Sequence, residues 1–222
     1  MIQLQNLCKT FLLKGRRKIV ANDITATFPS GASVALLGRN GAGKSTLLRM
    51  IAGTMSADSG QIISTGSISW PVGFAGSFHG DLTGLQNVRF IGRIYGVDTD
   101  DLVESVRDFS ELGQHFDLPV RSYSSGMRSR LAFGVSMGID FDTYLVDEVT
   151  SVGDASFKAK SISIFTERMA ERGAIVVSHA PDMVRKMCQH GAVLEEGRLT
   201  YYEDLEVALE HHMQLIEANR AK

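Results

Sequence analysis

The stretch that decides the fold of this 222-residue chain is Gly38-Arg39-Asn40-Gly41-Ala42-Gly43-Lys44-Ser45-Thr46. It has the G-x-x-x-x-G-K-[ST] spacing of a phosphate-binding P-loop. Residues 33–37, just before it, are apolar and partly β-branched, which predicts a buried strand. Residues 47–52 favour a helix that ends near Gly53. A strand, a glycine-rich loop and a helix in this order predict a nucleotide site.

The residue types of the loop suit a polyphosphate. Glycines let backbone N–H groups surround phosphate oxygens without a Cβ in the way. The helix that follows points the positive end of its dipole at the anion. We expect Lys44 to reach the β- and γ-phosphates and the Ser45 hydroxyl to bind Mg²⁺.

Composition limits the classes of function. The formal net charge of −2 does not suit a nucleic-acid partner, because such proteins usually carry a basic surface. Cys8 and Cys188 lie far apart without metal-type spacing, so we expect reduced thiols. No apolar run has the length of a membrane span, so work at a membrane would need a partner.

The sequence pattern of the first 28 residues predicts a hairpin. Residues 2–7 and about 18–28 favour strands, joined by a basic turn at residues 14–18. That turn is either a solvated hairpin tip or a contact to lipid head groups. Phe11, at the end of the first strand, is either a stacking surface for adenine or a core aromatic.

The middle and the end of the chain favour helices. Residues 66–84 are glycine-rich and contain Trp70, Phe74 and Phe78. Either at least Phe74 or Phe78 lines a groove for a partner, or all three fold into the core. Residues 85–118 favour helices with breaks near Gly96 and Gly113. A final helix from about Glu203 places four apolar side chains on one face: Leu205, Leu209, Met213 and Ile216.

Three further segments carry candidate site residues. Ser124-Ser125-Gly126 opens a helix and predicts a second anion-binding N-terminus. Asp147-Glu148 and His179 each follow an apolar strand, and alternating strands and helices predict an α/β fold with a largely parallel core. Ligands bind at the carboxyl ends of such strands, so Gly38, Asp147 and His179 can converge.

Each of these residues has a predicted role in phosphoryl transfer. We expect Asp147 to hold Mg²⁺, Glu148 to polarise an attacking water, and His179 to donate to the γ-phosphate. Taken singly, Asp147-Glu148 could be only a helix cap, and His179 could be structural. Their joint occurrence with the P-loop favours catalysis.

The order of P-loop, Ser-Gly signature, Asp147-Glu148 and His179 resembles the nucleotide-binding subunit of ATP-binding cassette (ABC) transporters over nearly the whole chain. The resemblance implies a P-loop NTPase fold with an antiparallel β subdomain, forming one domain over residues 1–222. It places a helical insertion with the signature at about 75–140 and a C-terminal helix at about 203–222.

The resemblance also implies the mechanism. ATP and Mg²⁺ would be bound, with two ATP molecules sandwiched in a head-to-tail homodimer. Ser124 and Gly126 would contact the γ-phosphate of the other subunit's ATP, and Ser125 would offer a backbone N–H. One departure is that no glutamine stands where such proteins carry a glutamine loop; His79 is the nearest polar residue.

Finer features resemble the ATPase subunit of capsular polysaccharide exporters. These are Ser69-Trp70-Pro71, Leu82-Thr83-Gly84, Tyr123–Arg130 and Asp147–Asp154. The resemblance implies export across the bacterial inner membrane through a separate polytopic permease, with this chain at the cytoplasmic face. An O-antigen or teichoic-acid type exporter is the alternative, and a soluble ABC ATPase without a transport role is a further one.

Other classes fit the residues less well. A regulatory module without catalysis would be expected to lack Lys44 or Glu148, and both are present. A P-loop kinase or GTPase would explain Lys44 but not the signature at Ser124–Gly126.

Overall fold

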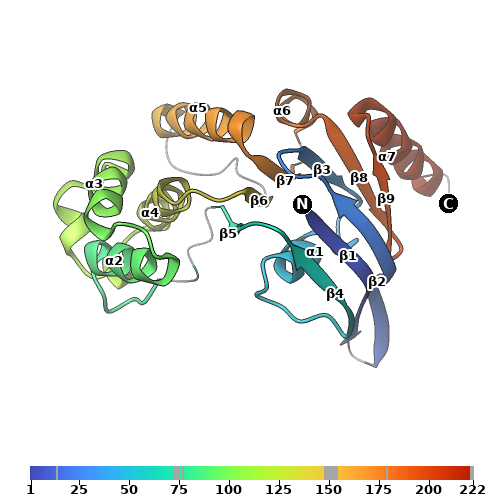
Figure 1. The fold of residues 1–222 in the computed structure, drawn as a ribbon, viewed down its shortest axis with the longest axis horizontal. Helices are drawn as coiled ribbons and strands as arrows, with labels where there is room; N and C mark the ends of the chain where they lie inside the picture. Colours follow the sequence, from blue (N-terminus) through green and yellow to red (C-terminus); the bar gives the residue numbers. More distant parts are fainter. Residues whose placement is uncertain (14, 73–75, 77, 148–154, 179, 221–222) are drawn as a thin grey trace. The chain divides into compact units, whose positions relative to one another are not determined.

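The computed structural model describes residues 1–13, 15–72, 76, 78–147, 155–178 and 180–220 (Figure 1). The chain forms two compact units. The first comprises Met1–Pro71, Phe141–Glu148 and Met169–Lys222, and the second comprises Val72–Asp140 and Val149–Arg168. Neither unit is a continuous stretch of sequence.

The first unit is built on a six-stranded sheet in the order β5-β6-β7-β3-β8-β9. All neighbours are parallel except β8 and β9, which pair antiparallel. The strands are β3 (Ser33–Leu37), β5 (Ile68–Pro71), β6 (Thr143–Asp147), β7 (Gly173–Val177), β8 (His190–Glu195) and β9 (Arg198–Tyr202). Every residue of β3 and β7 is buried, which explains their continuous apolar sequences.

A second, antiparallel sheet belongs to the same unit, in the order β2-β1-β4. Its strands are β1 (Ile2–Leu13), β2 (Arg16–Phe28) and β4 (Ser59–Ser64). The hairpin is longer than the predicted strands 2–7 and 18–28, because pairing continues through the basic segment to Leu13 and Arg16. Helices α1 (Lys44–Ile51), α6 (Pro181–Met187) and α7 (Leu205–Arg220) complete the unit.

One apolar core joins both sheets of this unit with α1. Leu4 from β1, Leu36 from β3 and Leu48 from α1 are among its buried members. Burying one such side chain contributes about 1.5–3 kcal/mol. The P-loop, which connects β3 to α1, is therefore anchored at both ends in packed core.

The second unit is helical. It holds α2 (Gly84–Tyr95), α3 (Thr99–Ser110), α4 (Ser125–Gly138), most of α5 (Ala155–Glu171), and the 3₁₀ turns η2 (Gly113–Asp117) and η3 (Val120–Ser122). Phe109 stacks on Phe133 with ring centroids 5.4 Å apart and meets Phe157 edge-on at 5.2 Å. Aromatic contacts thus pack α3, α4 and α5 together.

Local signals set the ends of α2. Thr83 accepts a hydrogen bond from the Gln86 N–H, and the Gln86 side chain accepts from the Thr83 N–H, which forms a capping box. Gly96 ends the helix with φ of 67°. The predicted break near Gly96 therefore has a physical basis.

The predicted apolar residues differ in burial. Trp70 lies in β5, half-buried, and meets Phe141 of the same unit edge-on at 5.4 Å, so for this residue the structure favours packing into the core. Met213 is 58% exposed on α7, although Leu205 and Leu209 of the same predicted face are buried. Phe74 lies outside the described residues.

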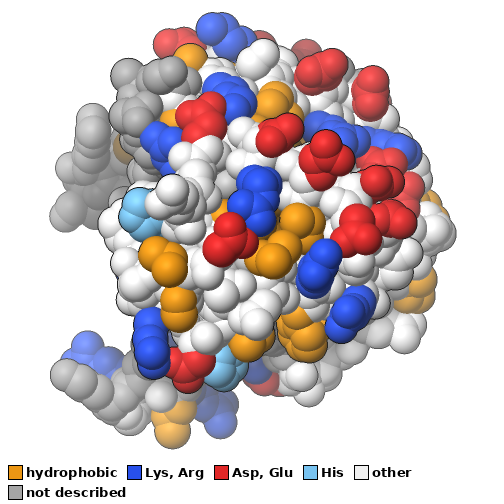
Figure 2. Space-filling model, turned by 90° about the vertical axis from the view of Figure 1, so that its left-hand side faces the viewer, with side chains coloured by type: hydrophobic (Ala, Val, Ile, Leu, Met, Phe, Trp, Pro, Cys, Tyr) orange, Lys and Arg blue, Asp and Glu red, His pale blue; other side chains and the backbone are white. Residues whose placement is uncertain are grey.

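The described helices do not include a membrane-crossing segment, since none is both long and apolar enough. Apolar side chains are nevertheless exposed on α2, where Phe90 is 55% and Ile94 is 61% accessible. Figure 2 shows one face of the molecule, on which apolar side chains are interspersed with acidic and basic ones.

Candidate nucleotide-binding site

The P-loop leads into α1 with an open helix N-terminus. The N-cap is Gly43, at φ 111°, and no side chain caps the first turn or places a carboxylate in it. The first N–H groups of a helix lack partners within the helix and carry partial positive charge. Here they can serve an anion, as the sequence predicts.

Two glycines of the loop are required by close contacts. A Cβ on Gly38 would lie 2.5 Å from the Leu194 carbonyl oxygen in β8, and one on Gly43 would lie 2.3 Å from Cγ1 of Val20 in β2. Both distances are shorter than any real Cβ contact. The loop is thus held between two strands, which fixes its backbone for ligand binding.

Lys44 is nearly buried, at 9% exposure. Its ammonium donates to the Gly38 carbonyl at 2.6 Å and to the Arg39 carbonyl at 3.1 Å. These bonds satisfy the charge within the loop and keep the cation there. The same ammonium can exchange a carbonyl for a phosphate oxygen, which makes a stronger, charge-assisted hydrogen bond.

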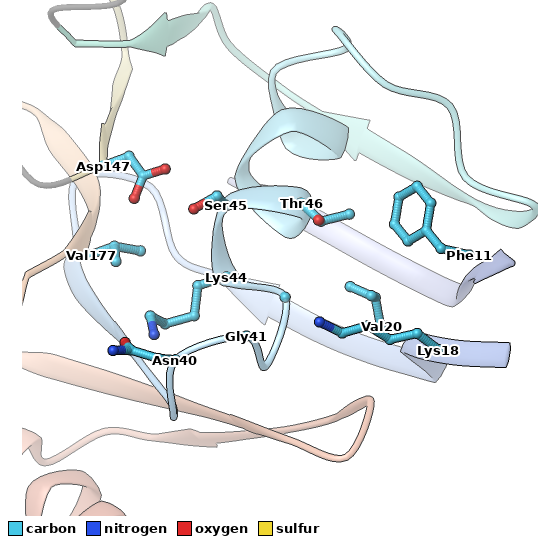
Figure 3. Close-up of a pocket in the computed structure, with 11 residues that line it drawn as sticks. Phe11, Lys18, Val20, Asn40, Gly41, Lys44, Ser45, Thr46, Asp147 and Val177 are labelled. Carbon is cyan, nitrogen blue, oxygen red and sulfur yellow. The ribbon is translucent and has the colours of Figure 1, made fainter. Parts of the chain in front are cut away.

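A cavity of about 810 Å³ lies over the loop (Figure 3). Its size suits a ligand the size of a nucleotide. The described lining residues come from β1, β2, the P-loop, α1, β6 and β7: Phe11, Lys18, Val20, Asn40, Gly41, Gly43, Lys44, Ser45, Thr46, Asp147 and Val177.

Predicted residues distant in sequence meet at this cavity. Phe11 is half-buried on its wall, with the Lys9 ammonium 5.5 Å from its ring centroid. Asp147 ends β6 and lines the same cavity. Phe11 is therefore neither fully core nor fully exposed, and a role in stacking adenine stays a prediction.

Ser45 and Asp147 fit the predicted Mg²⁺ site. Figure 3 shows the Ser45 hydroxyl and the Asp147 carboxylate pointing toward each other across the cavity. Oxygen donors of this kind suit Mg²⁺, which often takes only one or two protein ligands together with substrate phosphates. The described residues contain no cluster of three or more His, Cys, Asp or Glu that could hold an ion unaided.

Three predicted loop residues lie on the other side of the loop. Gly38, Arg39 and Ala42 line a second cavity of about 320 Å³ with residues of β8 and α7, and Asn40 and Gly41 border both cavities. Arg39 also contributes its carbonyl to Lys44. Its side chain is not among those that line the larger cavity.

The predicted signature lies in the helical unit. Ser124 is exposed and is the N-cap of α4, where its hydroxyl accepts from the Met127 N–H at 3.2 Å. Ser125 is exposed too, and a Cβ on Gly126 would have only Ser124 Oγ within 4 Å. Beside them, Tyr123 donates to the His115 carbonyl at 2.7 Å, and burial raises the pKa of its phenol. The Tyr123–His115 hydrogen bond thus anchors the chain just before α4, while Ser124 and Ser125 at the start of the helix are exposed to solvent.

The two predicted catalytic residues, Glu148 and His179, lie outside the described residues. The strands that lead to them are described: β6 ends at Asp147 and β7 ends at Val177. His79, the polar residue near the missing glutamine, donates its backbone N–H to Asn87 at 2.9 Å.

Three lining residues were missed from the sequence. Val20 and Val177 are buried apolar residues that gave no distinct signal. Lys18 was placed where the basic turn meets the second predicted strand; it belongs to β2 and is the cross-strand partner of Phe11. Only the register of the hairpin, which the sequence pattern does not specify, places Lys18 opposite Phe11.

A family model described as "ABC transporter" matches residues 21–151. The chain belongs to the ABC transporter family. Among curated relatives of this ABC protein, the polysialic acid transport ATP-binding protein KpsT of Escherichia coli is 47% identical and covers 96% of each chain. The capsule polysaccharide export ATP-binding protein CtrD of Neisseria meningitidis serogroup B is 43% identical, over 97% of this chain and 100% of the relative.

Solved structures support the fold. A dimeric ATP-binding cassette, MJ0796 in a post-hydrolysis state bound to ADP and Pi, superposes with a TM-score of 0.76, covering 92% of this ABC protein and 99% of that chain at 19% identity. The predicted ABC-type α/β fold and the resemblance to ATP-binding subunits of capsular polysaccharide exporters are confirmed. The family assignment also supports the prediction of an ATPase.

Proposed function

We propose that this chain is the ATP-hydrolysing subunit that powers export of capsular polysaccharide through a separate membrane subunit. The observation that carries the proposal is the near-full-length similarity to KpsT and CtrD, whose names state such roles. The cavity over an intact P-loop supplies the matching site.

The residues of the first unit would bind the nucleotide. The loop amides and Lys44 would hold the β- and γ-phosphates, with Phe11 beside the base. Ser45 and Asp147 would hold Mg²⁺, which when bound neutralises phosphate charge. Glu148 would position and deprotonate the attacking water, and His179 would donate to the γ-phosphate.

The signature residues would complete the site from a second copy of the chain. In the proposed head-to-tail homodimer, Ser124 and the Ser125 and Gly126 amides contact the γ-phosphate bound by the partner. An open helix start with exposed serines is suited to this task. ATP would then favour the closed dimer, and hydrolysis would reopen it.

A polytopic permease would hold the chain at the cytoplasmic face of the bacterial inner membrane. Exposed Phe90 and Ile94 on α2 support a protein partner, because exposed apolar patches often mark interaction sites. Closing and reopening of the dimer would change the conformation of that partner, which would then move the polysaccharide.

The proposal is tested by measuring surface polysaccharide in the bacterium that carries the gene. A strain with the gene deleted is complemented with wild type or with Glu148→Gln. The matched control is Arg49→Ala, which changes an exposed residue of α1. Wild type and Arg49→Ala should restore surface polysaccharide, whereas Glu148→Gln should leave polymer inside the cell. Normal surface polysaccharide in the deletion strain would refute the export role.

A further inference from the structure

Lys18 faces the nucleotide cavity from β2. It lies directly opposite Phe11 in the antiparallel β1–β2 pair, and both residues line the cavity. Side chains directly opposite in such a pair project from the same face. The register therefore places a cation beside the aromatic ring that borders the site.

The Lys18 ammonium reaches the P-loop. A Cβ built on Gly41 would lie 3.5 Å from the Lys18 Nζ, and Figure 3 shows this nitrogen next to the loop, across from Lys44. Lys18 is exposed, and within the described part of the chain its side chain takes part in no hydrogen bond or ion pair. A long, solvated side chain aimed at a phosphate-binding loop is available to an anionic ligand.

The charges around the cavity favour an anion at this place. Of its described lining residues, only Asp147 carries a carboxylate, and Figure 3 shows Asp147 on the opposite side from Lys18. Lys44 has its ammonium inside the loop, on the Gly38 and Arg39 carbonyls. The two lysines thus approach the loop from different sides.

We propose that Lys18 is a second cation for the polyphosphate chain of the bound nucleotide, reaching it from outside the P-loop. This inference rests on the proposed ATP site. It adds a residue that lies 20 positions before the first P-loop glycine, Gly38, and outside the loop's sequence pattern. Lys18 would raise affinity for charged nucleotides without taking part in the chemical step.

Arg17 is the matched control. It is the neighbouring residue, exposed and of the same charge, but it pairs with Leu12, so its side chain projects from the other face of the strand. A general effect of positive charge near the site would be lost equally in Arg17→Met and Lys18→Met. A direct contact would be lost only in Lys18→Met.

Titration calorimetry with ATP, ADP and adenosine tests the contact in four proteins: wild type, Lys18→Met, Lys18→Arg and Arg17→Met. We expect Lys18→Met to weaken ATP and ADP binding by about three- to tenfold, the range for one exposed charge-assisted contact. Adenosine binding should not change. Lys18→Arg should restore most of the affinity, and Arg17→Met should match wild type.

Several outcomes separate this inference from the proposed function. If the wild type does not bind ATP, the proposed ATP site fails. If it binds ATP but Lys18→Met binds ATP equally well, the Lys18 contact is refuted and the ATP site stands. Equal losses in Arg17→Met, or an equal loss for adenosine, also refute the contact. Melting temperatures without ligand show that each variant is folded.

Discussion

Lys44 has two backbone acceptors, the carbonyls of Gly38 and Arg39, at 2.6 and 3.1 Å. The loop is therefore organised around this ammonium. Replacing the side chain removes the cation and leaves two carbonyls to find water. We expect such a change to remove ligand binding and also to cost about 1–3 kcal/mol of stability, because Gly38 is buried whereas Arg39 is exposed.

Lys44→Ala should reduce ATP hydrolysis by at least about 10²-fold, since losing one electrostatic donor at a phosphoryl-transfer site has this effect. Phosphate release by the purified protein is the measurement. Arg49→Ala, on the exposed side of the same helix, is the control and should hydrolyse ATP like wild type. Turnover within tenfold of wild type in Lys44→Ala would contradict the P-loop assignment.

Gly43→Ala should destabilise the protein and abolish ATP binding. The new Cβ would lie 2.3 Å from Val20 at φ 111°, a conformation that L-residues rarely adopt. Gly53→Ala is the control at the other end of α1, where φ is 70° but nothing lies within 4 Å. It should cost about 1–2 kcal/mol of unfolding free energy and leave ATP affinity unchanged.

The two variants should differ in ATP affinity only if the close contact between Gly43 and Val20 sets the loop geometry that ATP binding needs. Denaturant unfolding and calorimetry with ATP measure both effects in each variant. Equal ATP affinities in Gly43→Ala and Gly53→Ala would show that the close contact to Val20 is not needed. The P-loop residues could be predicted because their signal is local in sequence, whereas the contact from Val20 could not.

At the scale of elements, β5 and β6 are joined by a polar contact at their starts. The Asp142 carboxylate accepts from the backbone N–H and the hydroxyl of Ser67, at 2.8 and 2.9 Å. Those hydrogen bonds hold the pKa of Asp142 below its usual value of 3.8, and Arg172 lowers it further. Because Asp147 ends β6, this contact supports a strand of the nucleotide cavity.

Asp142 should make the protein acid-sensitive. A carboxyl group whose pKa is lower in the folded than in the unfolded state stabilises the fold at every pH above its unfolded pKa. This stabilisation is lost as pH falls below about 4 toward the folded pKa. Asp142→Asn should therefore flatten the fall of melting temperature between about pH 5 and 3. Glu104→Gln, at an exposed carboxylate on α3, should keep the wild-type slope; equal slopes in all three proteins would refute this role.

A helix or strand could be predicted accurately where its sequence signal is local. The predicted break near Gly96 is a real helix end, and the apolar runs of β3 and β7 are buried strands. The hairpin β1–β2 was predicted too short, because the start of β2 is basic and exposed and has the composition of a turn, although cross-strand pairing continues to Leu13 and Arg16. The packing of Trp70 was left open for a related reason: its partner Phe141 is 71 positions away in sequence.

At the scale of the whole molecule, the proposed dimer can be tested by combining two inactivating substitutions, one in each subunit. Ser124→Arg should block turnover, since bulk at the start of α4 would prevent closure against the partner's phosphate. Mixed with Lys44→Ala subunits, it forms heterodimers in which one site carries both changes and the other carries neither. ATPase activity of the mixture should exceed that of either variant alone.

The unmixed variants at the same total concentration are the controls. Without ATP each should melt in one cooperative transition, at a lower temperature in Ser124→Arg because the N-cap of α4 is lost. Full activity of Ser124→Arg alone, or turnover by isolated monomers, would contradict the shared site. Only the family resemblance implied this arrangement, because the proposed composite site would need a second chain, whose contacts one sequence does not encode as a local pattern.

The division of the chain into two discontinuous units limits how they can be exchanged between relatives. The chain passes between units after Pro71, Asp140, Glu148 and Arg168. A chimera that tests which unit selects the export partner must therefore graft Val72–Asp140 and Val149–Arg168 together. It must also keep β6 from the recipient, because this strand belongs to the nucleotide-binding unit although donor sequence would flank it on both sides.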